Sequence, residues 1–156
     1  MKTQINIKKY TIIAILMAIL SCHGFAQDGK TPTITKTFEL NQPGTLNSRS
    51  TCGGIVVKSH NESTVEVQVF IQRNYKILSP TDPLVADILE KIDLEIDKNG
   101  SVINVYAEHE NNFSLMGNFG FNLTIIVPRE MSCNVSSSGG GLEIYGVGGT
   151  HDFNSS

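Results

Sequence analysis

The most regular feature of the chain is an alternation of hydrophobic and polar residues. In the stretch TVEVQVFIQ, Val65, Val67, Val69 and Ile71 fall on one face of an extended chain, and mostly polar residues fall on the other. This period of two predicts a half-buried β-strand. Buried side chains of this size stabilise a fold by roughly 1.5–3 kcal/mol each, so we expect this strand to anchor the core.

Shorter stretches of the same kind predict further strands, at residues 37–40, 55–59, 94–97, 102–107, 121–127, 133–136 and 142–147. The Asn99–Gly100 pair is typical of a tight hairpin turn between two of them. Pro128 should close the strand that ends at Val127, because proline cannot donate a ladder hydrogen bond. The expected fold class is therefore mostly β.

One stretch, SPTDPLVADILEKI, has hydrophobic residues at helical spacing instead. Asp82 is a suitable N-cap and Pro83 a suitable first helical residue. The pattern predicts one short amphipathic helix over about 82–92, which would cover an end or a face of the sheet. A helix that binds a partner is the alternative.

Two segments of the chain repeat each other. LNSRSTCGGIVVKS and CNVSSSGGGLEIYG align without gaps, so that Ser50 meets Ser137, Gly53 and Gly54 meet Gly140 and Gly141, and Ile55 meets Leu142. Each segment reads as a small polar strand, a glycine turn and an alternating strand. The glycines are expected to form structural turns, which need either a positive φ or the close approach of a neighbouring backbone. At the end of the sequence Ser155 takes the position of Ser137, 18 residues earlier.

Short strands joined by glycine turns and recurring about every 20 residues are typical of a β-solenoid, in which each rung stacks on its neighbours. We expect residues 36–156 to form one such β-repeat domain after a flexible N-terminal segment, 27–35. Solenoids need three or more rungs and a cap. We therefore expect the domain to be truncated at its C-terminus, with further rungs after Ser156.

The N-terminal segment has the three parts of a secretory signal peptide. Lysines 2, 8 and 9 precede an apolar run at 11–20, and SCHGFAQ supplies small residues for cleavage after Ala26. The apolar run is shorter than the roughly 20 residues that cross a bilayer, so no transmembrane span is expected in the mature chain. In an alternative interpretation ILSC is a lipobox, and Cys22 carries a lipid anchor.

Composition narrows the range of partners. The 156 residues, 40% of them hydrophobic, suit one domain. Removing residues 1–26 removes three lysines and no acidic residue, so the net charge falls from −3 to −6. An acidic chain without a basic cluster is a poor candidate for binding nucleic acid. Cys52 and Cys133 could form a disulfide in an oxidising compartment, or could be two separate buried thiols.

The exported N-terminus, the turns STCGGIVV and SSSGGGLEI, and the strand ending LTIIVP together resemble a bacterial envelope family known as "putative adhesins". The resemblance covers roughly Phe38 to Ser156. It implies stacked β-strands that form a solenoid and a domain with no established biochemical function. The family has no catalytic residues to carry over.

The sequence itself predicts no catalytic, cofactor or metal site. His60, His109 and His151 have no metal-ligand spacing and are expected in solvated loops, and the serines lack a nucleophile elbow. We therefore expect a non-enzymatic protein in the periplasm, in the outer membrane or at the cell surface, an adhesin or binding module for envelope proteins or surface glycans. The second hypothesis is a periplasmic or lipid-anchored structural or stress-related protein. A distant third is a polysaccharide-active enzyme that uses the carboxylates of Glu66, Asp93, Glu95 and Asp97.

Overall fold

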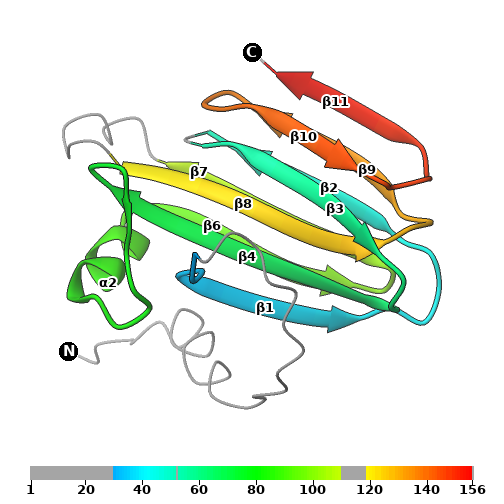
Figure 1. Ribbon diagram of the computed structural model, residues 1–156, viewed down its shortest axis with the longest axis horizontal. Coiled ribbons are helices and arrows are strands. Elements are labelled where there is room, and N and C mark those ends of the chain that lie inside the picture. Colours follow the sequence, from blue (N-terminus) through cyan, green and yellow to red (C-terminus); the bar gives the residue numbers. More distant parts are fainter. Residues whose placement is uncertain (1–29, 52, 110–118, 156) are drawn as a thin grey trace, which may run out of the picture.

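A computed structural model describes residues 30–51, 53–109 and 119–155. These residues form two facing β-sheets, one of six strands and one of five, and a single short helix (Figure 1). The expectation of a mostly-β fold is thereby confirmed. Both sheets mix parallel and antiparallel neighbours.

The six-stranded sheet follows the order β1 (Ile34–Glu39), β4 (Thr64–Arg73), β8 (Phe119–Pro128), β3 (Ile55–His60) and β10 (Leu142–Tyr145). Its sixth strand, β5 (Lys76–Ile77), pairs with the end of β4. Strands β8, β3 and β10 run parallel, whereas β4 is antiparallel to both β8 and β1.

The five-stranded sheet follows the order β11 (His151–Ser155), β9 (Ser132–Ser137), β2 (Thr45–Ser50), β7 (Val102–His109) and β6 (Ile92–Asn99). The first four strands run parallel to one another. Strand β6 is antiparallel to β7 and joins it through the predicted turn, in which Gly100 has a φ of 62°.

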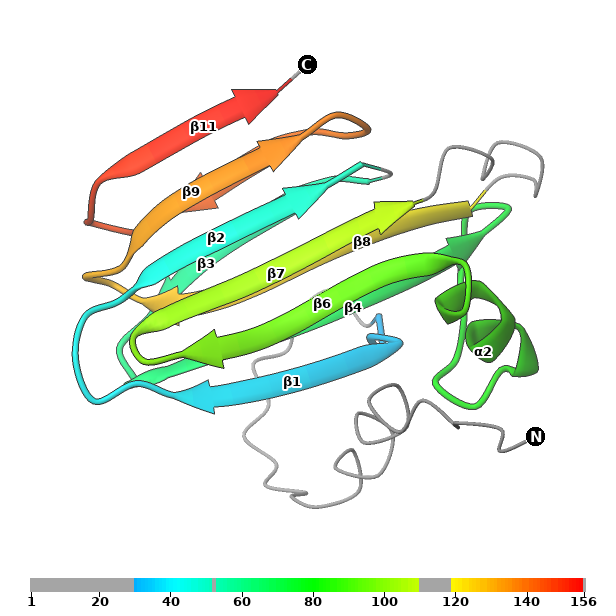
Figure 2. The ribbon, with the colours of Figure 1, turned by 180° about the vertical axis from the view of Figure 1, so that it is seen from behind.

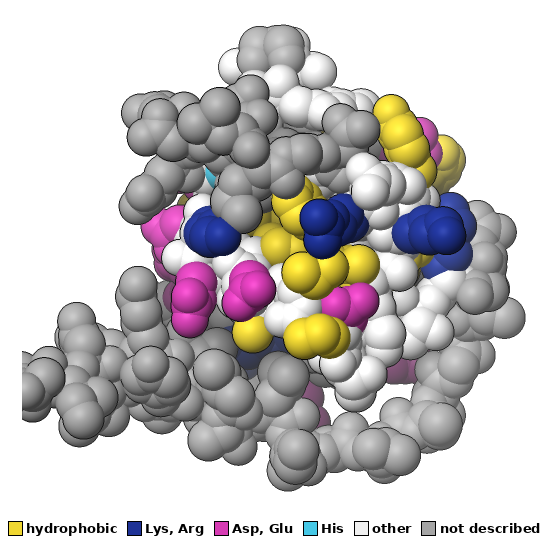
Figure 3. All heavy atoms as spheres, turned by 90° about the vertical axis from the view of Figure 1, so that its left-hand side faces the viewer, with side chains coloured by type: hydrophobic (Ala, Val, Ile, Leu, Met, Phe, Trp, Pro, Cys, Tyr) yellow, Lys and Arg dark blue, Asp and Glu magenta, His cyan; other side chains and the backbone are white. Residues whose placement is uncertain are grey.

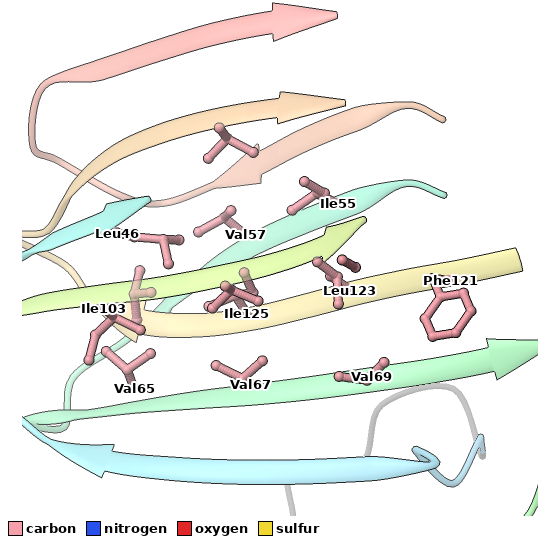
Figure 4. Close-up of a cluster of buried hydrophobic side chains, with 14 of the residues drawn as sticks. Leu46, Ile55, Val57, Val65, Val67, Val69, Ile103, Phe121, Leu123 and Ile125 are labelled. Carbon is pink, nitrogen blue, oxygen red and sulfur yellow. The ribbon is translucent and has the colours of Figure 1, made fainter. Parts of the chain in front are cut away.

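The core lies between the two sheets (Figure 4). Val65, Val67, Val69 and Ile71 of β4 are fully buried, as their alternation predicts. The five-stranded sheet contributes Leu46 of β2 and Ile103 of β7, also at 0% exposure.

The two repeated segments lie side by side in the register of their sequence alignment. Ser50 pairs with Ser137 and Ile55 with Leu142, in parallel strands. Ser155 pairs with Ser137, as its position in the sequence predicts. The layers do not follow chain order, however, because β7 and β8 lie on the other side of β2 and β3 from β9 and β10.

None of the four turn glycines Gly53, Gly54, Gly140 and Gly141 has a positive φ, and at Gly53 and Gly140 glycine is required by the close approach of a neighbouring backbone. A Cβ atom on Gly53 would lie 1.6 Å from the carbonyl oxygen of Phe121. A Cβ atom on Gly140 would lie 2.4 Å from the amide nitrogen of Gly54. The Ser137 hydroxyl joins the two turns, since it donates to the Gly53 carbonyl at 3.0 Å. Layers stacked at the strand spacing leave no room for side chains here.

Helix α2 (Pro83–Leu89) begins as predicted, with Asp82 as the N-cap that accepts a hydrogen bond from the Leu84 amide. The helix ends at Leu89 and does not extend to residue 92. Ile92 instead begins β6, where it is buried and pairs with His109.

Hydrophobic, basic and acidic side chains mix on the side of the molecule that carries α2 (Figure 3).

The N-terminal part of the described chain is more ordered than expected. Strand β1 begins at Ile34, within the segment predicted to be flexible. Just before it, Thr33 is buried, and its hydroxyl donates to the Leu78 carbonyl at 2.8 Å. This pairing with β4 and with the chain after β5 overrides the polar local composition.

The two sheets are offset by one strand, so the two ends of the stack differ (Figure 2). At one end β1 extends beyond β6, and two lysines connect these edge strands. Lys36 of β1 donates to the Ile96 carbonyl, and Lys98 of β6 donates to the Glu39 carbonyl. We call this the closed end. At the other end β11 extends beyond β10, and we call this the open end.

Candidate binding surface

The outer face of the five-stranded sheet carries polar side chains in rows. Parallel pairing without offset places equivalent positions of neighbouring strands next to one another. One row crosses all five strands in the order Asp97, Asn104, Asn47, Asn134 and Asp152. We call this row the asparagine ladder. The five-stranded sheet that carries this row is the sheet nearer the viewer in Figure 2.

Hydrogen bonds connect the three amides of the ladder. Asn134 Nδ2 donates to Asn47 Oδ1 at 3.0 Å, and Asn47 Nδ2 donates to Asn104 Oδ1 at 3.0 Å. A side-chain amide has two N–H donors and an oxygen that can accept two hydrogen bonds. Asn47 uses one donor and one acceptor position within the ladder, so one of each is left for solvent or a ligand.

A shallow hollow of about 290 Å³ lies beside the ladder, lined by Arg49, Asp93, Glu95, Tyr106 and Glu108. The guanidinium of Arg49 lies 3.3 Å from the Glu108 carboxylate, with the two side chains 61% and 40% exposed. A pair this exposed contributes little to stability, about 0–1 kcal/mol. The pair does, however, place the Arg49 guanidinium and the Glu108 carboxylate next to each other at the rim of the hollow.

The hollow is acidic, with three carboxylates to one guanidinium. Partial burial raises the pKa of Glu95 above its ordinary value, and the neighbouring Asp97 raises it further through its charge and a side-chain hydrogen bond. Asp93 and Glu108 add smaller effects in the same direction. Such a surface suits ligands that donate hydrogen bonds, such as hydroxyl groups, better than it suits anions.

Three of the four carboxylates considered for an enzyme lie together on the outer face of β6. Asp93 and Glu95 line the hollow, and Asp97, in the asparagine ladder, is close enough to Glu95 to share a hydrogen bond with it. Glu66 is on β4 of the other sheet, opposite Ile126 of β8. Among the described residues, no group of three or more His, Cys, Asp or Glu side chains could hold a metal ion.

The structure describes some of the remaining candidate residues but not all of them. Cys133 is a free, buried thiol, and burial raises its pKa to about 11. Cys22, Cys52 and the signal peptide lie outside the described residues, so lipidation and the disulfide stay predictions. His60, His109 and His151 lie at strand ends and not in loops. None of the described helices is both long and apolar enough to span a membrane.

Of this surface, the sequence analysis singled out only the carboxylates of Asp93, Glu95 and Asp97. It did not single out the three asparagines, although a signal for two of them was present. The spacing of 87 residues that aligns the two repeats also aligns Asn47 with Asn134. Asn104 belongs to neither repeat, and only the insertion of β7 beside β2 brings it into the row. Arg49 and Tyr106 become neighbours by the same pairing.

Comparisons with known proteins add little. No protein-family model matches the sequence, and no curated protein matches it. The structure is similar to a crystal structure of a putative cell adhesion protein from Clostridium sporogenes, with a TM-score of 0.39 and 14% sequence identity. The similarity covers 71% of this chain and 49% of that one, so this chain spans about half of that protein's length. At this TM-score the similarity carries no functional argument.

Proposed function

We propose that this chain is an exported, non-enzymatic binding module of the bacterial envelope, an adhesin-like protein. Its binding surface is the outer face of the five-stranded sheet. The observation that supports this most is the asparagine ladder, in which side-chain amides recur at the spacing of neighbouring strands. Asn104 and Asn134 are each hydrogen-bonded to Asn47 at 3.0 Å. A regular row of this kind can contact a repetitive ligand through many weak interactions.

Hydroxyl-rich glycans are the ligand class that this surface fits. Their hydroxyl groups donate and accept, which matches the unused donor and acceptor of Asn47. The acidic hollow beside the ladder adds carboxylate acceptors and the ring of Tyr106. Its acidic character disfavours nucleic acid and other polyanions.

Export and stacking complete the proposal. The N-terminal pattern supports secretion to the periplasm, the outer membrane or the cell surface. The in-register layers β2–β3 and β9–β10, followed by β11, support a solenoid-like stack that further rungs would continue after Ser156. A periplasmic or lipid-anchored structural protein is the second candidate, because the same polar face could contact envelope proteins.

Two measurements test the proposal. Protease treatment of intact cells should cleave the protein if it is at the surface, and should leave a periplasmic protein intact. Binding of the mature chain to an array of purified bacterial polysaccharides should show at least one neutral glycan. Replacing both Asn47 and Asn134 by alanine should weaken that binding by roughly tenfold or more, since each loses hydrogen-bonding groups.

The matched control is Gln68→Ala with Lys58→Ala, two changes on the outer face of the other sheet. These changes should leave glycan binding unaltered. Equal losses in the two variants, or no glycan binding by the parent chain, would contradict the assignment of this surface. Depolymerisation of a polysaccharide that Glu95→Gln abolishes would instead revive the enzyme hypothesis.

A further inference from the structure

The turn between β4 and β5 holds a tyrosine in a backbone conformation that favours glycine. Asn74 and Tyr75 form this two-residue turn, and their φ angles are 50° and 65°. Tight hairpin turns of this kind require positive φ angles, which bulky side chains rarely adopt. The turn between β6 and β7 has a glycine, Gly100, at its φ of 62°.

The Tyr75 side chain adds no packing that would offset this strain. It is 89% exposed, the largest value among the exposed large hydrophobic residues of the described chain. Burial of its ring therefore does not stabilise the hairpin. A residue that is strained and also contributes no packing suggests a function at that position. We call residues 73–76 the hairpin tip.

Two cations flank this tyrosine. Arg73 and Lys76 lie opposite each other in the pairing of β4 with β5, and neither forms an ion pair within the described residues. The Arg73 guanidinium lies over the Phe119 ring, 5.4 Å from its centre. Tyr and Arg are enriched among the residues that dominate protein interfaces. Because a turn protrudes from the end of its strands, it fits a hollow in a partner better than a flat surface.

The acidic hollow on the five-stranded sheet has the complementary charge. Its three carboxylates and one guanidinium give a net charge of −2, whereas the hairpin tip carries +2. Arg49 is paired with Glu108, so Asp93 and Glu95 have no ion-pair partner among the described residues. Partial burial and the neighbouring carboxylates raise the pKa of Glu95. A cation placed in the hollow would therefore relieve a repulsion that already exists there.

We propose that the hairpin tip of one copy of this chain docks into the acidic hollow of a second copy. The Tyr75 ring then lies against the Tyr106 ring and the exposed Arg49 guanidinium of the second copy, two groups that pack favourably on an aromatic ring. The hairpin tip and the hollow are different patches, so the contact is heterologous. This inference does not rest on the glycan proposal, although a glycan that filled the hollow would compete with the hairpin tip.

The charges of the two surfaces have similar spacings. Residues directly opposite each other in an antiparallel pair, such as Arg73 and Lys76, lie about 5 Å apart. Asp93 and Glu95 are two residues apart along β6, a separation of about 7 Å. Long basic side chains can span this difference, so both ion pairs can form at once. Exposed ion pairs are weak, and we therefore expect reversible association that weakens as the salt concentration rises.

Sedimentation velocity of the mature chain over a range of concentrations tests the proposal. The average mass should rise with protein concentration and fall at high salt. Tyr75→Gly should raise the dissociation constant at least about tenfold, because it removes the central ring of the interface. The same change relieves the positive φ of a bulky residue, so thermal unfolding should show that this variant is at least as stable as the parent chain.

A mixture of two variants tests the docking itself. Glu95→Lys reverses a charge in the hollow and should weaken self-association as strongly as Tyr75→Gly does. The Glu95→Lys variant keeps an intact hairpin tip, and the Tyr75→Gly variant keeps an intact hollow. An equimolar mixture of the two should therefore form a 1:1 complex with the affinity of the parent chain.

The matched controls make the same kinds of change at other exposed positions. Tyr145→Ala removes an aromatic side chain that is 53% exposed, and Glu62→Lys reverses an exposed charge in the turn between β3 and β4. Both variants should associate as the parent chain does. A parent chain that stays monomeric up to about 1 mM would overturn the proposal. So would a mixture of the two docking variants that stays monomeric, or self-association that Tyr75→Gly leaves unchanged.

Discussion

Gly53 and Gly140 lie where the backbones of neighbouring layers come closest. A Cβ atom on Gly53 would collide with the backbone of Phe121, whereas one on Gly141 would meet no atom within 4 Å. The two glycines of a Gly-Gly turn therefore differ in how much they contribute to stability, although the sequence alone does not distinguish them.

Gly53→Ala should destabilise the fold by about 2 kcal/mol or more, because a backbone must shift to accept the methyl group. Gly141→Ala is the matched control and should change stability by less than about 0.5 kcal/mol. Urea unfolding of the two variants measures the difference. Similar effects at both positions would mean that the layers are not packed as described.

Cys133 gives the fold a dependence on alkaline pH. Burial raises the pKa of its thiol from an ordinary value of 9.0 to about 11. The folded state therefore favours the neutral thiol, and this contribution is complete below pH 9 and is lost as the pH rises to about 11. A shift of this size corresponds to roughly 3 kcal/mol.

Denaturant unfolding at several values between pH 8 and pH 11 should therefore show a steeper loss of stability for the parent chain than for Cys133→Ala. The thiol should also react slowly with Ellman's reagent until the chain unfolds. If Cys133 is instead bridged to Cys52, the two proteins should show the same pH dependence.

At the scale of elements, β2 shows how context overrides local pattern. Its sequence, TLNSRS, has one large hydrophobic residue, yet Leu46, Ser48 and Ser50 are all buried. It forms a strand because β7 and β9 pair with it on both sides. The repeat in the sequence indicated a small polar strand there, whereas hydrophobic alternation alone did not.

Helix α2 depends more on local signals. Its N-cap Asp82 accepts the Leu84 amide at 2.9 Å, which satisfies one of the free donors of the first turn. Asp82→Ala should lower stability by about 1 kcal/mol, whereas Thr81→Ala, one exposed residue earlier, should have little effect. Thermal unfolding distinguishes the two. An equal effect of both changes would argue against the cap.

At the scale of the whole molecule, the two ends of the stack differ in how they are protected. The lysines of the closed end donate to backbone carbonyls of the opposite sheet. They occupy acceptors that an incoming strand would need, and they place positive charge at the edge. The described strands of the open end have no such lysines.

Replacing Lys36 and Lys98 by methionine should loosen β1 without unfolding the core. The two lost hydrogen bonds together remove about 2 kcal/mol, so the amides of β1 should exchange with deuterium roughly 30-fold faster. Lys58→Met, on the outer face of β3, is the control. Unchanged exchange in β1 would show that the lysines do not hold this end together.

The sequence by itself determined the features that depend on neighbours along the chain or on the repeat. Alternation predicted β4, capping residues predicted the start of α2, and the gapless alignment predicted the register of β2 with β9 and of β3 with β10. The alignment succeeded because parallel strands that stack without offset place equivalent residues next to one another.

Only the tertiary structure decided the rest. Contacts between segments distant in sequence place β7 and β8 beside the first repeat, and so bring the third amide into the ladder. Such contacts also end α2 early and offset the two sheets by one strand. Local pattern carries no information on which strand becomes whose neighbour, because any alternating strand can pair with any other. The surface that we propose for glycan binding follows from that choice of neighbours.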